Sequence, residues 1–218
     1  MAKKQKTISS PKQPKQAKDN ENDYLKVLPN ELWLNSIIGK DFYDIDLLRL
    51  VDFYVLHSPC KVSSYSPITL ERLGWKNPWH SSCFRAAFDE VAGFVEGENF
   101  IYSESKNHFL EKWTDLEYNF PSDCNNEYAV FVKAGEGNPR MDLLHRIRNS
   151  LAHGRFTAVR RNGEFYISME DVTELQGLNG LYVVARICLK KSTLISLMDF
   201  FERKSDKAKQ LYSLHIID

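Results

Sequence analysis

Residues 138–171, NPRMDLLHRIRNSLAHGRFTAVRRNGEFYISMED, contain the clearest structural signals in the chain. Asn138 can cap a helix, and Pro139 fits the first helical turn. Gly154 suits the left-handed position just past a helix end. The stretch therefore predicts a helix over 138–153, which ends close to a histidine, His153.

Directly after this helix, the sequence changes to β-prone residues. Two such runs flank Asn162-Gly163, the dipeptide that most strongly favours a tight hairpin turn. We therefore expect a β-hairpin over 155–169. A third β-prone run, YAVFV at 128–132, predicts a short strand.

Elsewhere, apolar spacing of three and four residues predicts helices over 41–57, from about 81 to 97, over 106–120 and over 180–204. The expected core stripe of the first of these is Ile45, Leu48, Val51, Asp52 and Val55. In the second it is Phe84, Ala87, Phe88, Val91, Phe94 and Val95. In the last it is Val184, Ile187, Cys188, Leu194, Ile195, Met198 and Phe201. The predicted fold is mostly α: a helical bundle of about five helices with an inserted β-hairpin.

The composition of the 218 residues, 43% hydrophobic and 27% charged, is typical of globular proteins. Residues 1–23 hold six lysines and three acids and almost no apolar side chain, so we expect a disordered basic tail there. Residues 24–218 are expected to form a single domain, with 23 basic and 26 acidic residues. This balance argues against a broad electropositive surface, so any RNA contact is expected to be local.

The rest of the sequence predicts the cellular compartment of the protein and whether it holds a metal. No apolar run is long enough to span a membrane, and the N-terminus lacks a secretory signal. The four cysteines form no C-x-x-C pair, so we expect reduced thiols in a cytoplasmic protein. No carboxylate cluster has metal-ligand spacing, and we expect neither a metal nor another cofactor.

The predicted helix over 138–153 has two chemically different faces. Leu143, Leu144, Ile147 and Leu151 fall within one arc and predict the core face. His145, Asn149 and His153 are spaced four residues apart on the other side, together with Asp142 and Arg146. Arg148 lies about 140° from His153 on an ideal helix. The two side chains can serve one phosphate only if the helix unwinds near Ala152 or the arginine reaches round.

Arg148, Asn149 and His153 suit RNA cleavage without a metal. A histidine titrates near neutral pH and can take the proton of a 2′-hydroxyl that attacks the adjacent phosphate. An arginine fork matches the oxygens on which charge gathers in the transition state. Asn149 can orient the imidazole or bind a phosphate oxygen. Alternatively, these three residues lie on a solvated helix end, where a histidine interacts favourably with the helix dipole, and they have no catalytic function.

In the segment RNSLAHG, polar Asn149 directly follows Arg148, and four residues separate Arg148 from His153. This pattern resembles the motif of the HEPN superfamily. The resemblance implies an α-helical bundle and a metal-independent endoribonuclease, in which two copies pair so that their motifs meet in one cleft. It implies that His153 is the base, that Arg148 holds the scissile phosphate and that Asn149 supports the site. It also implies a role in phage defence or a toxin–antitoxin response, with an antitoxin or defence protein as a further partner.

Four more residues are candidates for RNA contacts around this motif. These are His145 on the same helix and Arg155, Arg160 and Arg161 on the hairpin. The alternative from a different class is a non-catalytic HEPN-like helical module that dimerises or scaffolds a defence or regulatory complex. An unrelated helical interaction domain is a third hypothesis.

Overall fold

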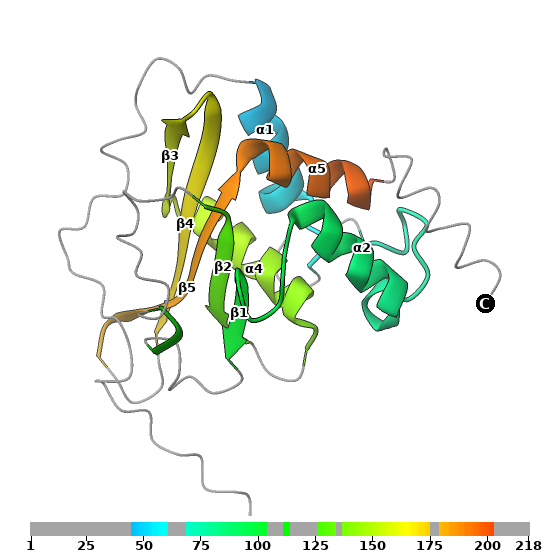
Figure 1. Cartoon of the computed structure of the whole chain (residues 1–218), viewed down its shortest axis with the longest axis horizontal. Helices are drawn as coiled ribbons and strands as arrows, with labels where there is room; N and C mark the ends of the chain where they lie inside the picture. The colour runs from blue at the N-terminus through cyan, green and yellow to red at the C-terminus, as the bar shows by residue number, and fades with distance from the viewer. Residues whose placement is uncertain are drawn as a thin grey trace, which may run out of the picture.

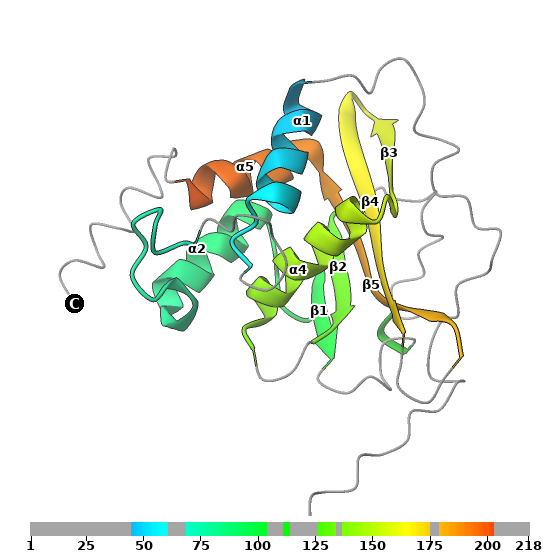
Figure 2. The same ribbon diagram turned by 180° about the vertical axis from the view of Figure 1, so that it is seen from behind.

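The computed structural model describes residues 45–60, 69–103, 111–113, 126–133, 137–174 and 179–202. These residues form a mixed α/β fold, in which four α-helices lie on one face of a five-stranded sheet (Figures 1 and 2). The strand order is β1-β2-β5-β4-β3. The strands are β1 (Phe100–Ser103), β2 (Tyr128–Val132), β3 (Phe156–Arg161), β4 (Glu164–Glu174) and β5 (Leu181–Lys190). Among these five described strands, β1 and β2 form the only parallel pair.

The predicted mostly α bundle is therefore wrong. The error is largest at residues 181–190, which were expected to begin the last helix and instead form the central strand β5. This strand is buried on both faces, so its sequence LYVVARICLK is nearly continuously apolar, and such a run also fits a helical stripe. Strand β1 was not predicted at all.

The predicted hairpin is confirmed, as the edge of a larger sheet. Strands β3 and β4 pair antiparallel from Phe156–Met169 to Arg161–Glu164. At the turn, Asn162 and Gly163 both have positive φ, 50° and 85°, as the tight turn between right-handed twisted strands requires. Strand β2 coincides with the predicted strand over 128–132.

The helices are α1 (Ile45–Val51), α2 (Ser82–Ala92), α4 (Pro139–Ala152) and α5 (Lys191–Phe201). A π-helix (Asp52–Leu56) continues α1, and a 3-10 helix (Pro78–His80) precedes α2. Helix α4 agrees with the predicted helix: Asn138 Oδ1 accepts from the Arg140 N–H, and Pro139 occupies the first turn. Helix α5 is the second half of the predicted helix over 180–204.

The apolar face predicted for the first helix is only partly right: Val55 packs against the core, but the N-terminal part of the stripe does not. Ile45 and Leu48 are 73% and 69% exposed, whereas Leu50, Phe53 and Tyr54 are buried. The buried face carries the aromatic side chains Phe53 and Tyr54, and aromatic rings bury more apolar surface than smaller aliphatic side chains do. The Tyr54 hydroxyl donates to the Leu194 carbonyl oxygen at 2.8 Å, and this bond fixes the π-helix against α5.

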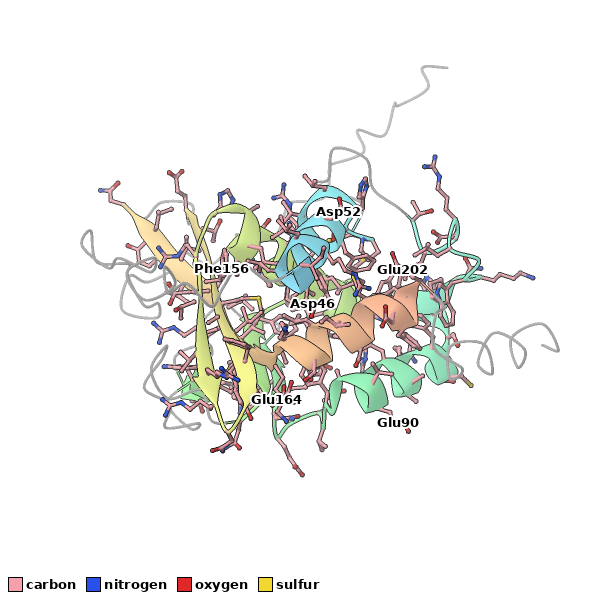
Figure 3. All side chains as sticks on the ribbon, turned by 90° about the horizontal axis from the view of Figure 1, so that it is seen from above. Asp46, Asp52, Glu90, Phe156, Glu164 and Glu202 are labelled. Carbon is pink, nitrogen blue, oxygen red and sulfur yellow. The ribbon has the colours of Figure 1, made fainter. Side chains whose placement is uncertain are left out.

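Two apolar clusters cover the two faces of the sheet. The larger cluster joins one face to all four α-helices and is rich in aromatic rings; Phe84, for example, packs edge-on against Trp75 at 4.9 Å between ring centroids. Viewed from above, the helices gather on one side of the strands, and Asp46 of α1 faces α5 (Figure 3), where it pairs with Lys191 at 3.2 Å. The smaller cluster, around Trp113 and Tyr128, lies on the other face.

Several predictions lie partly or wholly outside the described residues. These are the tail over 1–23, the start of the single domain at 24, Cys124 and most of the helix over 106–120, of which residues 111–113 are helical. Cys60 and Cys188 are buried free thiols, and Cys83 is an exposed one. In the parts of the chain that are described, no helix has the length and hydropathy of a membrane span.

Gly154 allows the α4 end to form and provides a test of the fold. Its φ is +67°, so an alanine there is expected to lower the free energy of unfolding by about 1 kcal/mol. Gly137→Ala, at the other end of α4, is the matched control because a Cβ there would meet Asp142 Oδ1 at 3.5 Å, an ordinary contact. Urea unfolding of both variants measures the difference. Equal stabilities would show that the α4 end does not require the left-handed residue.

Candidate functional site at the end of helix α4

The site is built on the C-terminal end of α4. The Gly154 N–H donates to the Leu151 carbonyl oxygen at 3.2 Å, and the Arg155 N–H donates to that of Ser150 at 2.8 Å. This pair of bonds is the Schellman arrangement, which closes a helix through a left-handed residue. His153 is the last residue before that turn, with φ −93° and ψ 5°, and its side chain is exposed. Helix α4 therefore ends at Ala152, and His153 is its C-cap, whose N–H still donates to the Asn149 carbonyl oxygen at 2.9 Å.

Arg148 is held by a relay that starts at a buried carboxylate. Asp171 of β4 is 2% exposed, and its Oδ2 accepts from Asn149 Nδ2 at 3.3 Å. The Asn149 Oδ1 in turn accepts from Arg148 Nη1 at 3.0 Å. Only one orientation of the amide satisfies both partners, because a carboxylate needs a donor and a guanidinium needs an acceptor. Asn149 therefore links Arg148 to the sheet.

Arg146 strengthens the anchor of this relay. Its Nη1 donates to Asp171 Oδ2 at 2.7 Å, and its Nη2 donates to the Val132 carbonyl oxygen at 2.9 Å. The guanidinium thus ties α4 to both β4 and β2. Because Asp171 receives a charged donor and an amide, its charge is compensated inside the protein.

His145 lies beside the relay, half-buried. Burial, and then the charge of Arg146, hold the pKa of His145 below its usual range, although the nearby Asp171 opposes this. The imidazole is therefore neutral at pH 7. A neutral side chain can donate a hydrogen bond to RNA, but it adds no positive charge for a phosphate.

Arg155 belongs to a buried ion-pair cluster rather than to an RNA-binding surface. It pairs with Glu170, which is fully buried on β4, and Arg186 Nε of β5 donates to the other carboxylate oxygen at 2.9 Å. Arg186 also lies over the Trp113 ring, 4.8 Å from its centroid. The Arg155 side chain is 15% exposed, so it faces the interior of the fold rather than an RNA backbone.

The two remaining candidate arginines are on strand β3. Arg160 is exposed and lies over the Phe165 ring, 5.6 Å from its centroid. Arg161 is half-buried and is paired in register with Glu164 across the hairpin turn. Of the three hairpin arginines, Arg160 is thus the most exposed to solvent.

No match was found for the chain among family models, curated proteins or solved structures. The role of the site is therefore inferred from its own geometry. Arg148 and Asn149 are brought together with Asp171, while no hydrogen bond or ion pair joins the His153 side chain to them among the described residues. Within the same residues, no three His, Cys, Asp or Glu side chains are placed to share a metal ion.

Asp171, Glu170 and Arg186 were not predicted as site residues, and Arg146 was expected only to lie on the solvent face of the helix. A signal for them was present: Glu170-Asp171 and Arg186 are charged residues inside runs that otherwise favour buried strands. Charges are rarely buried without a partner, so such residues predict ion pairs once the strand is recognised. Because residues 181–190 were assigned to a helix, the Glu170–Arg186 cross-strand pair could not be foreseen.

The lowered pKa of His145 predicts a dependence of stability on pH. In the unfolded chain a histidine titrates near pH 6.5, so below that pH the unfolded state binds more protons at this position than the folded state does. The stability associated with His145 is thus complete above about pH 6.5 and is lost as the pH falls below it. His145→Gln is expected to lose less stability than wild type between pH 7.5 and 5. Urea unfolding at both pH values tests this, and identical losses would contradict it.

Proposed function

We propose that the protein is a metal-independent endoribonuclease that cuts RNA at the C-terminal end of α4. In this proposal His153 is the general base, and Arg148 holds the phosphate that is cut. Asn149 positions Arg148 and does not touch the substrate. The HEPN resemblance of the segment RNSLAHG first suggested these roles, but the mixed α/β fold is not the bundle that the resemblance implied, so the support comes from the local geometry.

The observation that carries the proposal is the Asp171–Asn149 relay, which anchors the Arg148 guanidinium in the last turns of α4, where His153 is exposed. On a continuous helix, Arg148 and His153 would project about 140° apart. His153 keeps the helical bond from its N–H to the Asn149 carbonyl oxygen, and the Asp171–Asn149 relay fixes Arg148 about one and a half turns earlier. The two side chains therefore meet at one phosphate through the length of Arg148 or across the seam of a dimer. Both side chains therefore belong to one end of one helix, with an exposed imidazole and an anchored guanidinium.

The chemistry needs only these groups. His153 takes the proton of a ribose 2′-hydroxyl, and the oxygen attacks the adjacent phosphorus. The bond from phosphorus to the 5′-oxygen then breaks, which leaves a 2′,3′-cyclic phosphate and a 5′-hydroxyl that takes its proton from water. Arg148 offers a fixed planar donor set to the non-bridging oxygens as their charge grows.

Assembly and biological setting are part of the proposal. A homodimer in which two α4 ends meet would place two basic sites on one RNA. Sedimentation of wild-type protein tests for this dimer. Phage defence or a toxin–antitoxin response, with a partner protein that restrains the nuclease, is the setting that the resemblance implies, and a cleavage assay with purified protein does not depend on it.

The test uses purified protein in EDTA with single-stranded RNA and with DNA of the same sequence. We expect cleavage of RNA, products that end in a 2′,3′-cyclic phosphate and no cleavage of DNA, because DNA lacks the 2′-hydroxyl. RNA with one 2′-deoxy nucleotide is expected to resist cleavage at that linkage alone. Cleavage of DNA, or cleavage that appears only with a divalent metal, would contradict the proposal.

A second candidate is a non-catalytic module that dimerises or scaffolds a larger complex. The involvement of Arg155 and Asn149 in internal contacts favours it, because it leaves fewer groups to bind RNA. A protein that cuts no RNA in EDTA or with metal, yet sediments as a dimer, would support this candidate over the nuclease.

A further inference from the structure

A cavity of about 480 Å³ lies at the opposite end of α4 from His153. It is an open pocket, lined by residues from the segment before α2, from α2 itself and from the start of α4: Pro59, Leu70, Glu71, Trp79, His80, Arg85, Gly137, Asn138 and Met141. A cavity of this size is in the range that holds a small organic ligand. The 15 steps of helical rise from Asn138 to His153 span about 22 Å, so this cavity is separate from the proposed cleavage site.

The cavity contains a guanidinium that is fixed in place but not neutralised. Arg85 Nη1 donates to the Trp79 carbonyl oxygen at 3.1 Å, and Asn138 Nδ2 donates to the same oxygen at 2.9 Å. Arg85 forms no ion pair within the described part of the chain, in contrast to Arg140, Arg146 and Arg155. His80, two residues before α2, adds an exposed imidazole.

The rest of the lining is divided between apolar surface and one acid. Leu70 and Pro59 are buried, and Met141 and Trp79 are half-buried, so they form an apolar wall. Glu71 is exposed and also forms no ion pair among the described residues, so its carboxylate can accept from an amino group. A ligand that matches this lining carries one anionic group, a flat apolar body and an amino group.

We propose that this cavity binds a nucleoside monophosphate. The phosphate pairs with Arg85 and His80, because a fixed guanidinium with free donors suits phosphate oxygens. The base lies on the apolar wall and its amino group donates to Glu71. The negative charge of Glu71 disfavours a second phosphate group, so the monophosphate fits better than the triphosphate.

The experiment is isothermal titration of the whole protein with adenosine 5′-monophosphate, adenosine and inorganic phosphate. We expect the monophosphate to bind more tightly than either of the other two, because only it uses both halves of the cavity. Arg85→Met keeps the aliphatic stem and is expected to weaken binding about tenfold or more, as the loss of a charge-assisted hydrogen bond does. Arg72→Met is the matched control, since Arg72 is exposed, lies beside Glu71 and does not line the cavity.

Met141→Trp is a second variant that fills the cavity and leaves Arg85 and its bond to Trp79 in place. It is expected to abolish binding, and thermal unfolding of each variant shows whether the fold is intact. No heat of binding for the monophosphate up to about 5 mM would overturn the proposal. Equal affinity for adenosine and its monophosphate, or unchanged affinity in Arg85→Met, would overturn it as well. None of these outcomes depends on whether the protein cuts RNA.

Discussion

Replacement of Glu170 by alanine is expected to lower the free energy of unfolding by about 3–5 kcal/mol, a larger loss than we expect from any other substitution in the sheet. Glu170 is fully buried, and its two carboxylate oxygens serve Arg155 and Arg186 separately. Removal of the carboxylate leaves two guanidinium groups, 15% and 14% exposed, without the negative charge that they share. A buried positive charge that loses its partner costs far more than an exposed ion pair contributes.

Glu174→Ala provides the control for this prediction. Glu174 lies four residues further along the same strand and is exposed, and its replacement is expected to change the free energy by less than about 0.5 kcal/mol. Urea unfolding at pH 7, followed by far-UV circular dichroism, measures both variants. A Glu170→Ala protein within about 1 kcal/mol of wild type would show that the Arg155–Glu170–Arg186 cluster is not central to the sheet.

His153→Ala is expected to lower the rate of RNA cleavage about a hundred- to ten-thousand-fold, the range that a general base contributes. The stability of the fold is expected to remain close to that of wild type, because the His153 side chain is exposed and forms no hydrogen bond among the described residues. Initial rates on a labelled RNA in EDTA, with thermal unfolding of the same samples, separate a chemical effect from a folding effect.

Two further variants make the prediction for His153 specific. His57→Gln replaces another solvent-accessible histidine, outside the proposed site, and is expected to leave the rate unchanged. Arg148→Lys keeps the positive charge but loses the planar fork, and is expected to reduce the rate as well. A rate in His57→Gln as low as that in His153→Ala would show that the loss does not arise from the α4 end.

Local signals in the sequence predicted the part of the fold around the site. The cap at Asn138, Pro139 and the left-handed Gly154 act within a few residues, so helix α4 could be located before any tertiary structure was known. The same holds for the Asn162-Gly163 turn. These features depend on backbone geometry that particular residue types favour or require.

The sheet could not be predicted in the same way. Strand β5 pairs with the preceding strand, β4, and with β2, which lies far earlier in the sequence. Its apolar pattern fits a strand and a helix equally well. The exposed Ile45 and Leu48 show the same limit, since spacing predicts a stripe but does not determine which stripe is buried. The Asp171–Asn149–Arg148 relay depends on the packing of α4 on β4, so it too required the structure.

In the proposed mechanism, the end of α4 cuts RNA through His153 and Arg148 without a metal. The most direct measurement is the ratio of initial cleavage rates for wild type and His153→Ala on one single-stranded RNA in EDTA, with equal thermal stability shown for both proteins. We predict that wild type cleaves and that the ratio is about a hundred or more. A ratio near one, with both proteins active in EDTA, would contradict the claim.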